Sequence, residues 1–290
     1  MEMRHNIVVL ALVCAWLAPN SAAAQRPTRP PRNPKKPPST GTAGRTQLPA
    51  RSFAAWLEDA DTLEPGSVSM GLSVGRWESL DGGETDGPVF DAAAGVTPRI
   101  QVSASIPYYR ASYSDGFAAQ GLGDTYLAAK VQLLDAGEYG VGIAVLPIVE
   151  ILSEAAVSDT TLGLSRVNWG IPVSVQVGSD ETRAYGTAGY FSRGAVFGGA
   201  ALERAISERV TLAATLTYTH ATRTNAASDL AGLSRSRTDA AGGVYFRISR
   251  AVTISAGAGR TVSAMDQNGA RLTANAGISI LMSRHASRPE

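Results

Sequence analysis

Seven charged residues share the polar face of segments in which polar and apolar side chains alternate. These residues are Asp91, Asp124, Lys130, Glu150, Glu203, Asp239 and Arg247. Charges of both signs around an enclosed space can select solutes by charge and size, and Lys130 is the only lysine beyond position 36. We therefore predict that Lys130 and Arg247 form a polar constriction together with the carboxylates. The alternative is that these charges pair across strands and fill a narrow interior.

Three tyrosines, Tyr109, Tyr126 and Tyr245, fall on the same polar face. Their rings could stack on a flat solute or could simply fill space. The alternation in RAYGTAGYFS (183–192) is ambiguous, so the sequence does not decide which of Tyr185 and Tyr190 joins them.

The sequence contains no nucleophile elbow, no cluster of metal ligands and no phosphate-binding loop. The GLGD stretch at 121–124 leads into a strand pattern rather than a helix, which excludes a phosphate loop there. His220 would suit a membrane-embedded lipid hydrolase only with a partnering Ser or Asn, and none stands at a recognisable spacing. We therefore predict no enzymatic activity, no cofactor and no metal.

The elements that carry these residues have the period of β-strands. In VTLAATLTYTH (210–220), apolar residues occupy the even positions and mostly Thr the odd ones, which is the pattern of a strand with one apolar and one polar face. We predict twelve such strands, at about 67–77, 89–96, 100–113, 124–134, 140–152, 167–177, 183–192, 195–206, 210–222, 238–249, 251–263 and 271–282.

The connections between these strands alternate in length. Short turns such as 97–99, 135–138, 179–182 and 207–209 are separated by longer polar loops at 80–87, 114–123, 153–166 and 223–236. Strands of about 9–11 residues, with short turns at one end and long loops at the other, are typical of up-and-down transmembrane barrels. The fold class is thus all-β, a single antiparallel barrel of about twelve strands, and lipid would cover its apolar face. A soluble β-sandwich, with the apolar faces as a shared core, is the alternative.

The two ends of the chain read as export and assembly features. Residues 1–24 have the charged start, short apolar run and Ala22-x-Ala24 site of a signal peptide, and the only cysteine, Cys14, lies within it. Residues 25–52 form a proline-rich arm with seven basic and no acidic residues, which we expect to be disordered. A pre-barrel segment at 53–66 follows, then the barrel at 67–282, whose last strand NAGISILM resembles the assembly signal of outer-membrane proteins, and a tail at 283–290.

Four stretches spread over the chain resemble a known bacterial family. They are EDADTLEPGSVSMGLSVG (58–75), GVTPRIQVSASIPY (95–108), GLGDTYLAAKVQLL (121–134) and AVFGGAALERAISERVTLAATLTY (195–218). In order and spacing they resemble the outer-membrane family named for the phenol-degradation meta-pathway, whose members are labelled transporters. The resemblance implies an outer-membrane β-barrel that moves small, aromatic or apolar molecules, and it supplies no catalytic motif.

The sequence favours a narrow passive channel in the outer membrane with both termini in the periplasm, because an even strand number returns the chain to the side where it began. A structural or envelope-tethering barrel with a closed interior is the second hypothesis, and a lipid hydrolase is the third. Expected partners are membrane lipid and lipopolysaccharide, the barrel-assembly machinery, a small permeant and an anionic envelope polymer that binds the arm, but no nucleic acid. Acidic loop residues could also hold cations that bridge lipopolysaccharide; they are Asp81, Glu84, Asp86 and Asp159.

Overall fold

A computed structural model describes residues 57–80, 82–113, 116, 118–154, 165–179, 181–223, 234–263 and 269–283. The predicted signal peptide, the arm and nearly all of the predicted tail lie outside these residues. So do large parts of two predicted loops, at 155–164 and 224–233.

The described residues fold into one antiparallel sheet of fifteen strands. The strands are β1 (Val68–Glu78), β2 (Gly82–Thr97), β3 (Ile100–Tyr113), β4 (Ala118–Leu122), β5 (Thr125–Leu134), β6 (Val141–Val145), β7 (Ile148–Ile151), β8 (Val167–Gly170), β9 (Val173–Gly178), β10 (Thr182–Phe191), β11 (Ala195–Ala205), β12 (Val210–Ala221), β13 (Ser236–Arg247), β14 (Val252–Ser263) and β15 (Leu272–Met282). A single turn of helix, α2 (Ala136–Tyr139), lies between β5 and β6.

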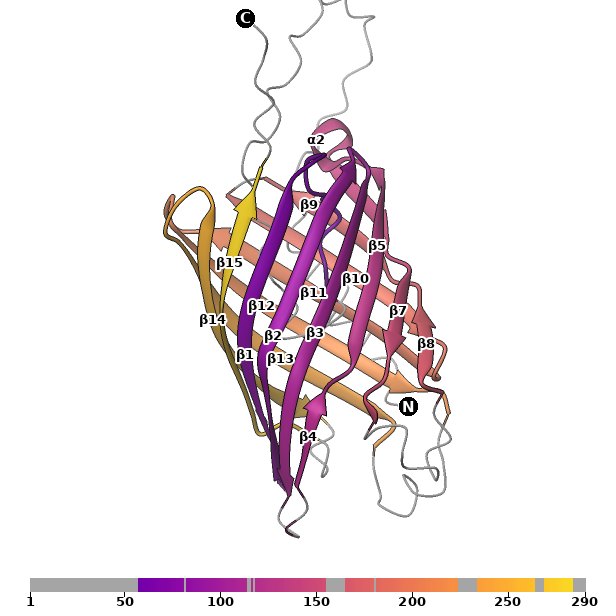
Figure 1. The fold of residues 1–290 in the computed structure, drawn as a ribbon. Coiled ribbons are helices and arrows are strands. Elements are labelled where there is room, and N and C mark those ends of the chain that lie inside the picture. The colour runs from indigo at the N-terminus through magenta and orange to yellow at the C-terminus, as the bar shows by residue number, and fades with distance from the viewer. Residues whose placement is uncertain are drawn as a thin grey trace, which may run out of the picture. The chain divides into compact units, whose positions relative to one another are not determined.

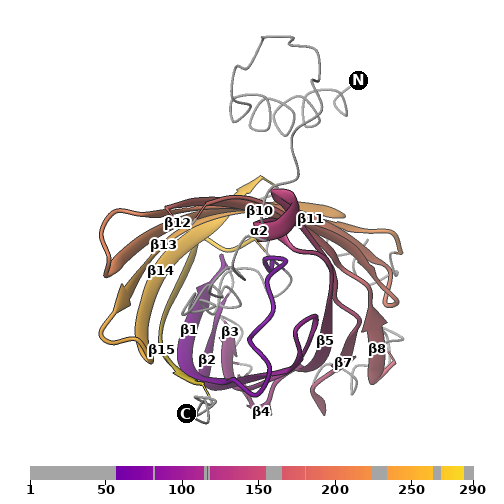
Figure 2. The ribbon, with the colours of Figure 1, turned by 90° about the horizontal axis from the view of Figure 1, so that it is seen from above.

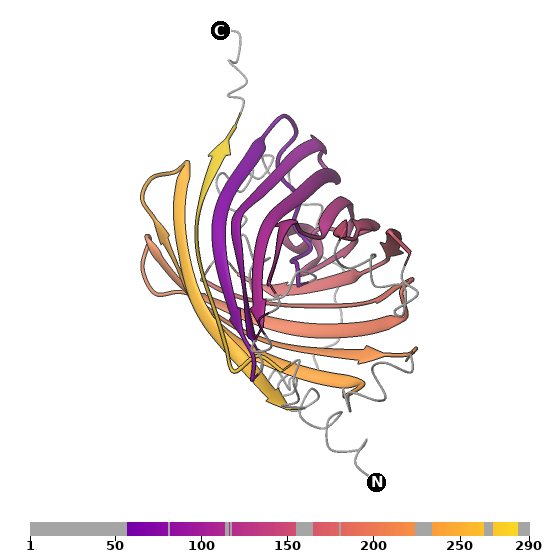
Figure 3. The ribbon, with the colours of Figure 1, turned by 60° about the horizontal axis from the view of Figure 1, so that its bottom comes forward.

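The sheet closes into a barrel because its first and last strands pair along their full lengths, from Val68 opposite Met282 to Glu78 opposite Leu272. Three positions in the ring are each formed by two strands, namely β4 with β5, β6 with β7, and β8 with β9. The ring therefore has twelve positions. Figures 1 and 3 show the strands inclined around this ring. The predicted fold class is confirmed, and a sandwich of two stacked sheets is wrong.

Prolines explain two of the three interruptions. Pro147 separates β6 from β7, and Pro172 precedes β9 in the neighbouring position of the ring. Proline has no N–H to donate to a sheet, so a strand breaks where it enters the middle of one. Their carbonyls still accept hydrogen bonds across the break, from Ala129 N to Pro147 O at 3.0 Å and from Leu146 N to Pro172 O at 2.9 Å. The wall therefore stays continuous there.

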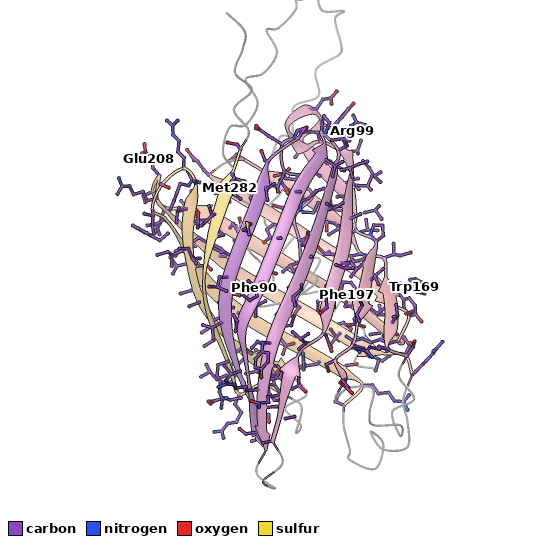
Figure 4. The ribbon with its side chains drawn as sticks, viewed as in Figure 1. Phe90, Arg99, Trp169, Phe197, Glu208 and Met282 are labelled. Carbon is purple, nitrogen blue, oxygen red and sulfur yellow. The ribbon has the colours of Figure 1, made fainter. Side chains whose placement is uncertain are left out.

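The two faces of the wall differ as the alternation predicts. In β12 the even positions are exposed on the outside, for example Leu212 at 46% and Leu216 at 40%, whereas the Thr side chains of the odd positions face inward. Large apolar side chains are exposed at every position of the ring except β10, including Phe90, Trp169 and Met282, which Figure 4 labels. An apolar surface of this extent needs a nonaqueous neighbour. Among the described residues, no helix is long and apolar enough to cross a membrane.

Nearly all the predicted strands begin and end within two residues of the observed bounds. The exception is the strand predicted at 89–96, because β2 begins at Gly82 and includes most of the stretch predicted as a loop. A break in register near Gly87 and Pro88 lets β2 continue through these turn-forming residues. Part of the predicted loop at 114–123 is likewise a strand, β4.

Candidate functional site

The residues Leu57–Ser67, here called the lumen segment, lie inside the barrel before the chain enters β1. Figure 2 shows this segment inside the ring of strands, in indigo. Leu57 packs against Tyr185 and Ala201, on β10 and β11, and Ala60 packs against β6. The segment therefore follows the inner wall from β11 round to β2 and β1.

Side chains of the wall satisfy the backbone of the lumen segment. Ala60 N donates to Gln176 Oε1 at 3.1 Å, and Leu63 N donates to Gln101 Oε1 at 2.9 Å. Thr187 Oγ1 accepts from Glu58 N at 3.2 Å and donates to Glu58 O at 2.9 Å. Because a buried backbone amide is costly to leave without a partner, these polar side chains fix the path of the segment.

Lys130 of β5 is the first of two buried cations that hold the lumen segment. Only 3% of this residue is exposed. Its Nζ lies 3.1 Å from Glu58 Oε2 and 3.1 Å from Asp59 Oδ1, and it donates to the carbonyl of Asp61 at 3.1 Å. All three partners belong to the lumen segment, so Lys130 joins the wall to it.

Arg183 of β10 is the second cation. Its Nη1 lies 2.6 Å from Asp59 Oδ2 and 3.6 Å from Asp61 Oδ2. Its Nε and Nη2 donate to Glu203 Oε2 of the neighbouring strand β11, and Tyr185 OH donates to Glu203 Oε1 at 2.9 Å. Asp59 thus bridges Lys130 and Arg183 with its two carboxylate oxygens.

The environment of Asp59 keeps it ionised. Burial alone would raise the pKa of its carboxyl group, but the charges of Lys130 and Arg183 and a hydrogen bond from Lys130 hold the pKa below its ordinary value of 3.8. At neutral pH this carboxylate therefore contributes a full negative charge to the network.

The network corrects one prediction from the sequence. Lys130 does take part in a charged cluster, as does Glu203, but Arg247 does not. The side chain of Arg247 is exposed at the end of β13 and makes no ion pair within the described part of the chain. Arg183, which the sequence reasoning missed, is the cation beside Lys130.

A second cluster lies on the inner face where β7, β8 and β10 meet. The Glu150 side chain is fully buried, with Tyr126 OH donating to its Oε1 at 3.2 Å and Arg193 Nη2 at 3.6 Å from the same oxygen. Beside it, Ile148, Phe191 and Phe197 form an apolar cluster, against which Tyr126 also packs. The other predicted acidic residue nearby, Asp124, accepts a hydrogen bond from the backbone of Ser153 at 2.8 Å.

The remaining predicted site residues line the wall. Asp239 accepts hydrogen bonds from Arg237 Nε at 2.9 Å and from Thr261 Oγ1 at 2.6 Å. Arg237 lies two residues along the same strand, β13, whereas Thr261 lies directly opposite Asp239 on β14. Asp91 is half-buried, and Tyr109 and Tyr245 are buried. Tyr185 is buried as well, whereas Tyr190 packs edge-on against the exposed Trp169, which settles the phase of β10.

His220 has a partner that the sequence reasoning missed. Its Nδ1 lies 2.8 Å from Ser236 Oγ across the β12–β13 pair. Tyr218 OH also donates to Ser236 Oγ, at 3.1 Å. Within the described residues, no carboxylate is bonded to the other ring nitrogen of His220, as it would be in a hydrolase triad. No group of three or more potential metal ligands occurs in that part of the chain either.

Comparison with known proteins supports the fold. No protein-family model matches the sequence, and no curated protein matches it. Among solved structures, the chain is similar to an outer-membrane channel of Pseudomonas putida F1, with a TM-score of 0.59 and 13% identity over 77% of this chain and 98% of that one. The NanC porin follows with a TM-score of 0.49 and 11% identity over 74% and 98%, a score too low to add to the assignment. At these identities the likeness shows a shared barrel fold.

Proposed function

We propose that the chain is an outer-membrane channel through which small solutes pass passively. The observation that carries the proposal is a closed ring with an apolar outside and a polar inside. Closed antiparallel barrels of this kind belong to outer membranes, where lipid covers the apolar band and the interior offers a polar path. A twelve-position ring leaves little width beyond its own side chains, so the path is narrow.

The lumen segment narrows this path further on the side of β10, β9 and β5. Passage therefore depends on how firmly the segment is held, which the ion pairs of Lys130 and Arg183 with Asp59 determine. The family resemblance adds aromatic or apolar molecules to the candidate solutes. The apolar cluster of Phe191, Phe197 and Ile148 is only 1–6% exposed, so it stabilises the wall rather than offering these solutes an open surface.

Single-channel recording in planar bilayers tests the proposal. The mature chain should give discrete conductance steps, and replacing 57–61 with a Gly-Ser stretch of equal length should enlarge them. Deleting 25–50 is the matched control and should leave the steps unchanged. A mature chain without steps, with or without the replacement, would favour a structural barrel that tethers the envelope through its arm.

A lipid hydrolase remains the candidate from another class because of the contact between His220 and Ser236. Incubation of the purified chain with phospholipid and lipopolysaccharide tests it directly. We expect no released fatty acid. Release that Ser236→Ala abolishes would instead establish the enzyme.

A further inference from the structure

We propose that Lys130 and Arg183 form an anion-binding site inside the barrel, which Glu58, Asp59 and Asp61 occupy as an internal ligand. A small solute with two or more carboxylates takes their place when the lumen segment leaves the site. The inference names a solute class for the proposed channel and rests on that function for its physiological meaning, although the binding itself does not require conduction.

The wall alone leaves positive charge uncompensated. Lys130 and Arg183 are 3% and 8% exposed, and buried cations need partners. Among the described residues, the wall supplies one carboxylate to this pair, Glu203, and it contacts Arg183 only. Both ion pairs of Lys130 are with the lumen segment. Without the segment, these three wall groups carry one net positive charge.

The lumen segment reverses the sign of the site. Its three carboxylates contact the two cations, at 3.1 Å from Lys130 for Glu58 and Asp59 and at 3.6 Å from Arg183 for Asp61. Together, these three carboxylates, Lys130, Arg183 and Glu203 carry two net negative charges. A site that becomes cationic only when its own segment leaves is able to bind an anion in exchange.

The arrangement of partners indicates the class of anion. One carboxylate, that of Asp59, bridges Lys130 and Arg183. A second carboxylate, that of Asp61, accepts a hydrogen bond from Gln176 Nε2 at 2.9 Å. Both carboxylates lie on a short stretch of chain, so a compact dicarboxylate satisfies the same cations and the same amide.

Titration calorimetry with succinate tests the site in detergent-solubilised mature chain at low chloride. The variant E58Q/D59N/D61N keeps the shape of the segment but removes its charge. An internal ligand leaves the site free for only a fraction of the time, and the apparent affinity for succinate falls in proportion to that fraction. We therefore expect this variant to bind succinate at least about tenfold more tightly than the parent. Adding Lys130→Gln should abolish that binding, and neutral succinamide should bind neither chain.

Two further variants keep the result interpretable. Asp239→Asn removes a lumen carboxylate that pairs with Arg237 elsewhere, and it should leave succinate binding unchanged. If the triple variant does not fold, as judged by its migration on unheated gels, Asp61→Asn alone should still tighten binding by a smaller factor. The proposal is overturned if removing the segment's carboxylates fails to tighten binding, or if Lys130→Gln leaves the binding intact.

Conductance separates this inference from the proposed function. A chain that binds succinate as expected but never conducts refutes the channel and retains the site. A chain that conducts but whose triple variant binds succinate no more tightly retains the channel and refutes the site.

Discussion

Replacing Lys130 with Met should release the lumen segment from the wall. The methionine side chain fills a similar volume but removes the charge between Glu58 and Asp59. Glu58 would then lose its ion pair with Lys130, and Asp59 would lose one of its two cations. Asp59 would still contact Arg183, which Glu203 already neutralises in part.

The free-energy cost of Lys130→Met follows from the burial of the Lys130 side chain. Lys130 is 3% exposed, and removing one partner of a buried ion pair costs about 3–5 kcal/mol. Strands paired on both sides hold the barrel, whereas a few side chains hold the segment, so the cost falls on docking. At about 1.4 kcal/mol for each factor of ten, the undocked population should rise by about two to three and a half powers of ten.

Limited proteolysis measures that population. A protease that cleaves after Glu or Asp can bind the lumen segment only when the segment is extended and has left the wall. When the segment redocks fast, the rate of cleavage is proportional to the undocked fraction. Arg76→Met is the control, since the Arg76–Glu78 pair is exposed by 42% and 48% and contributes at most about 1 kcal/mol. If the Lys130→Met chain folds and resists cleavage as well as the parent does, the ion pairs do not hold the segment.

Three further outcomes are expected. The pKa of Asp59 in the docked segment is lowered from 3.8, so docking of the lumen segment should persist from neutral pH down to about 3.8 and be lost as the pH falls through the lowered pKa. Cleavage of the segment by an acid-active protease should therefore rise only below about pH 3.8. Gly170→Ala should lower the unfolding temperature by the equivalent of about 1–3 kcal/mol, because the added Cβ would lie 2.7 Å from the Phe191 ring. Gly242→Ala is the control: the nearest atom to its Cβ is 3.7 Å away, so the unfolding temperature should change little. Leu216→Lys should cost about 2–4 kcal/mol in denaturant titrations in lipid, since it faces the bilayer; an unaltered midpoint would place Leu216 outside the apolar band.

The barrel could be predicted from the sequence because alternation acts at every strand. In a strand such as β12, the alternation of apolar residues with Thr is enough to show which face meets lipid, whatever the rest of the chain contains. The start of β2 could not be predicted in this way. Its glycines and Pro88 are turn formers, and only pairing with β1 and β3 shows that they continue a strand.

The candidate site was harder to predict because its decisive residues lack periodicity. The lumen segment is neither a strand nor a helix, and hydrogen bonds to side chains far along the chain determine its path. Arg183 was missed because β10 carries tyrosines on both faces, Tyr185 inside and Tyr190 outside, which hides its phase. One signal was present: the acidic run Glu58–Asp61 directly precedes a barrel with a single lysine.

The sequence distances within the network set the order in which the molecule can be completed. Asp59 is 71 residues from Lys130 and 124 residues from Arg183. Contacts that close such long stretches of chain form late, since the entropy of closure is lost before the contact returns any energy. The contacts of the lumen segment can therefore be completed only after β5 and β10 have joined the sheet. Burial of the lumen segment therefore marks the completion of the barrel wall around it.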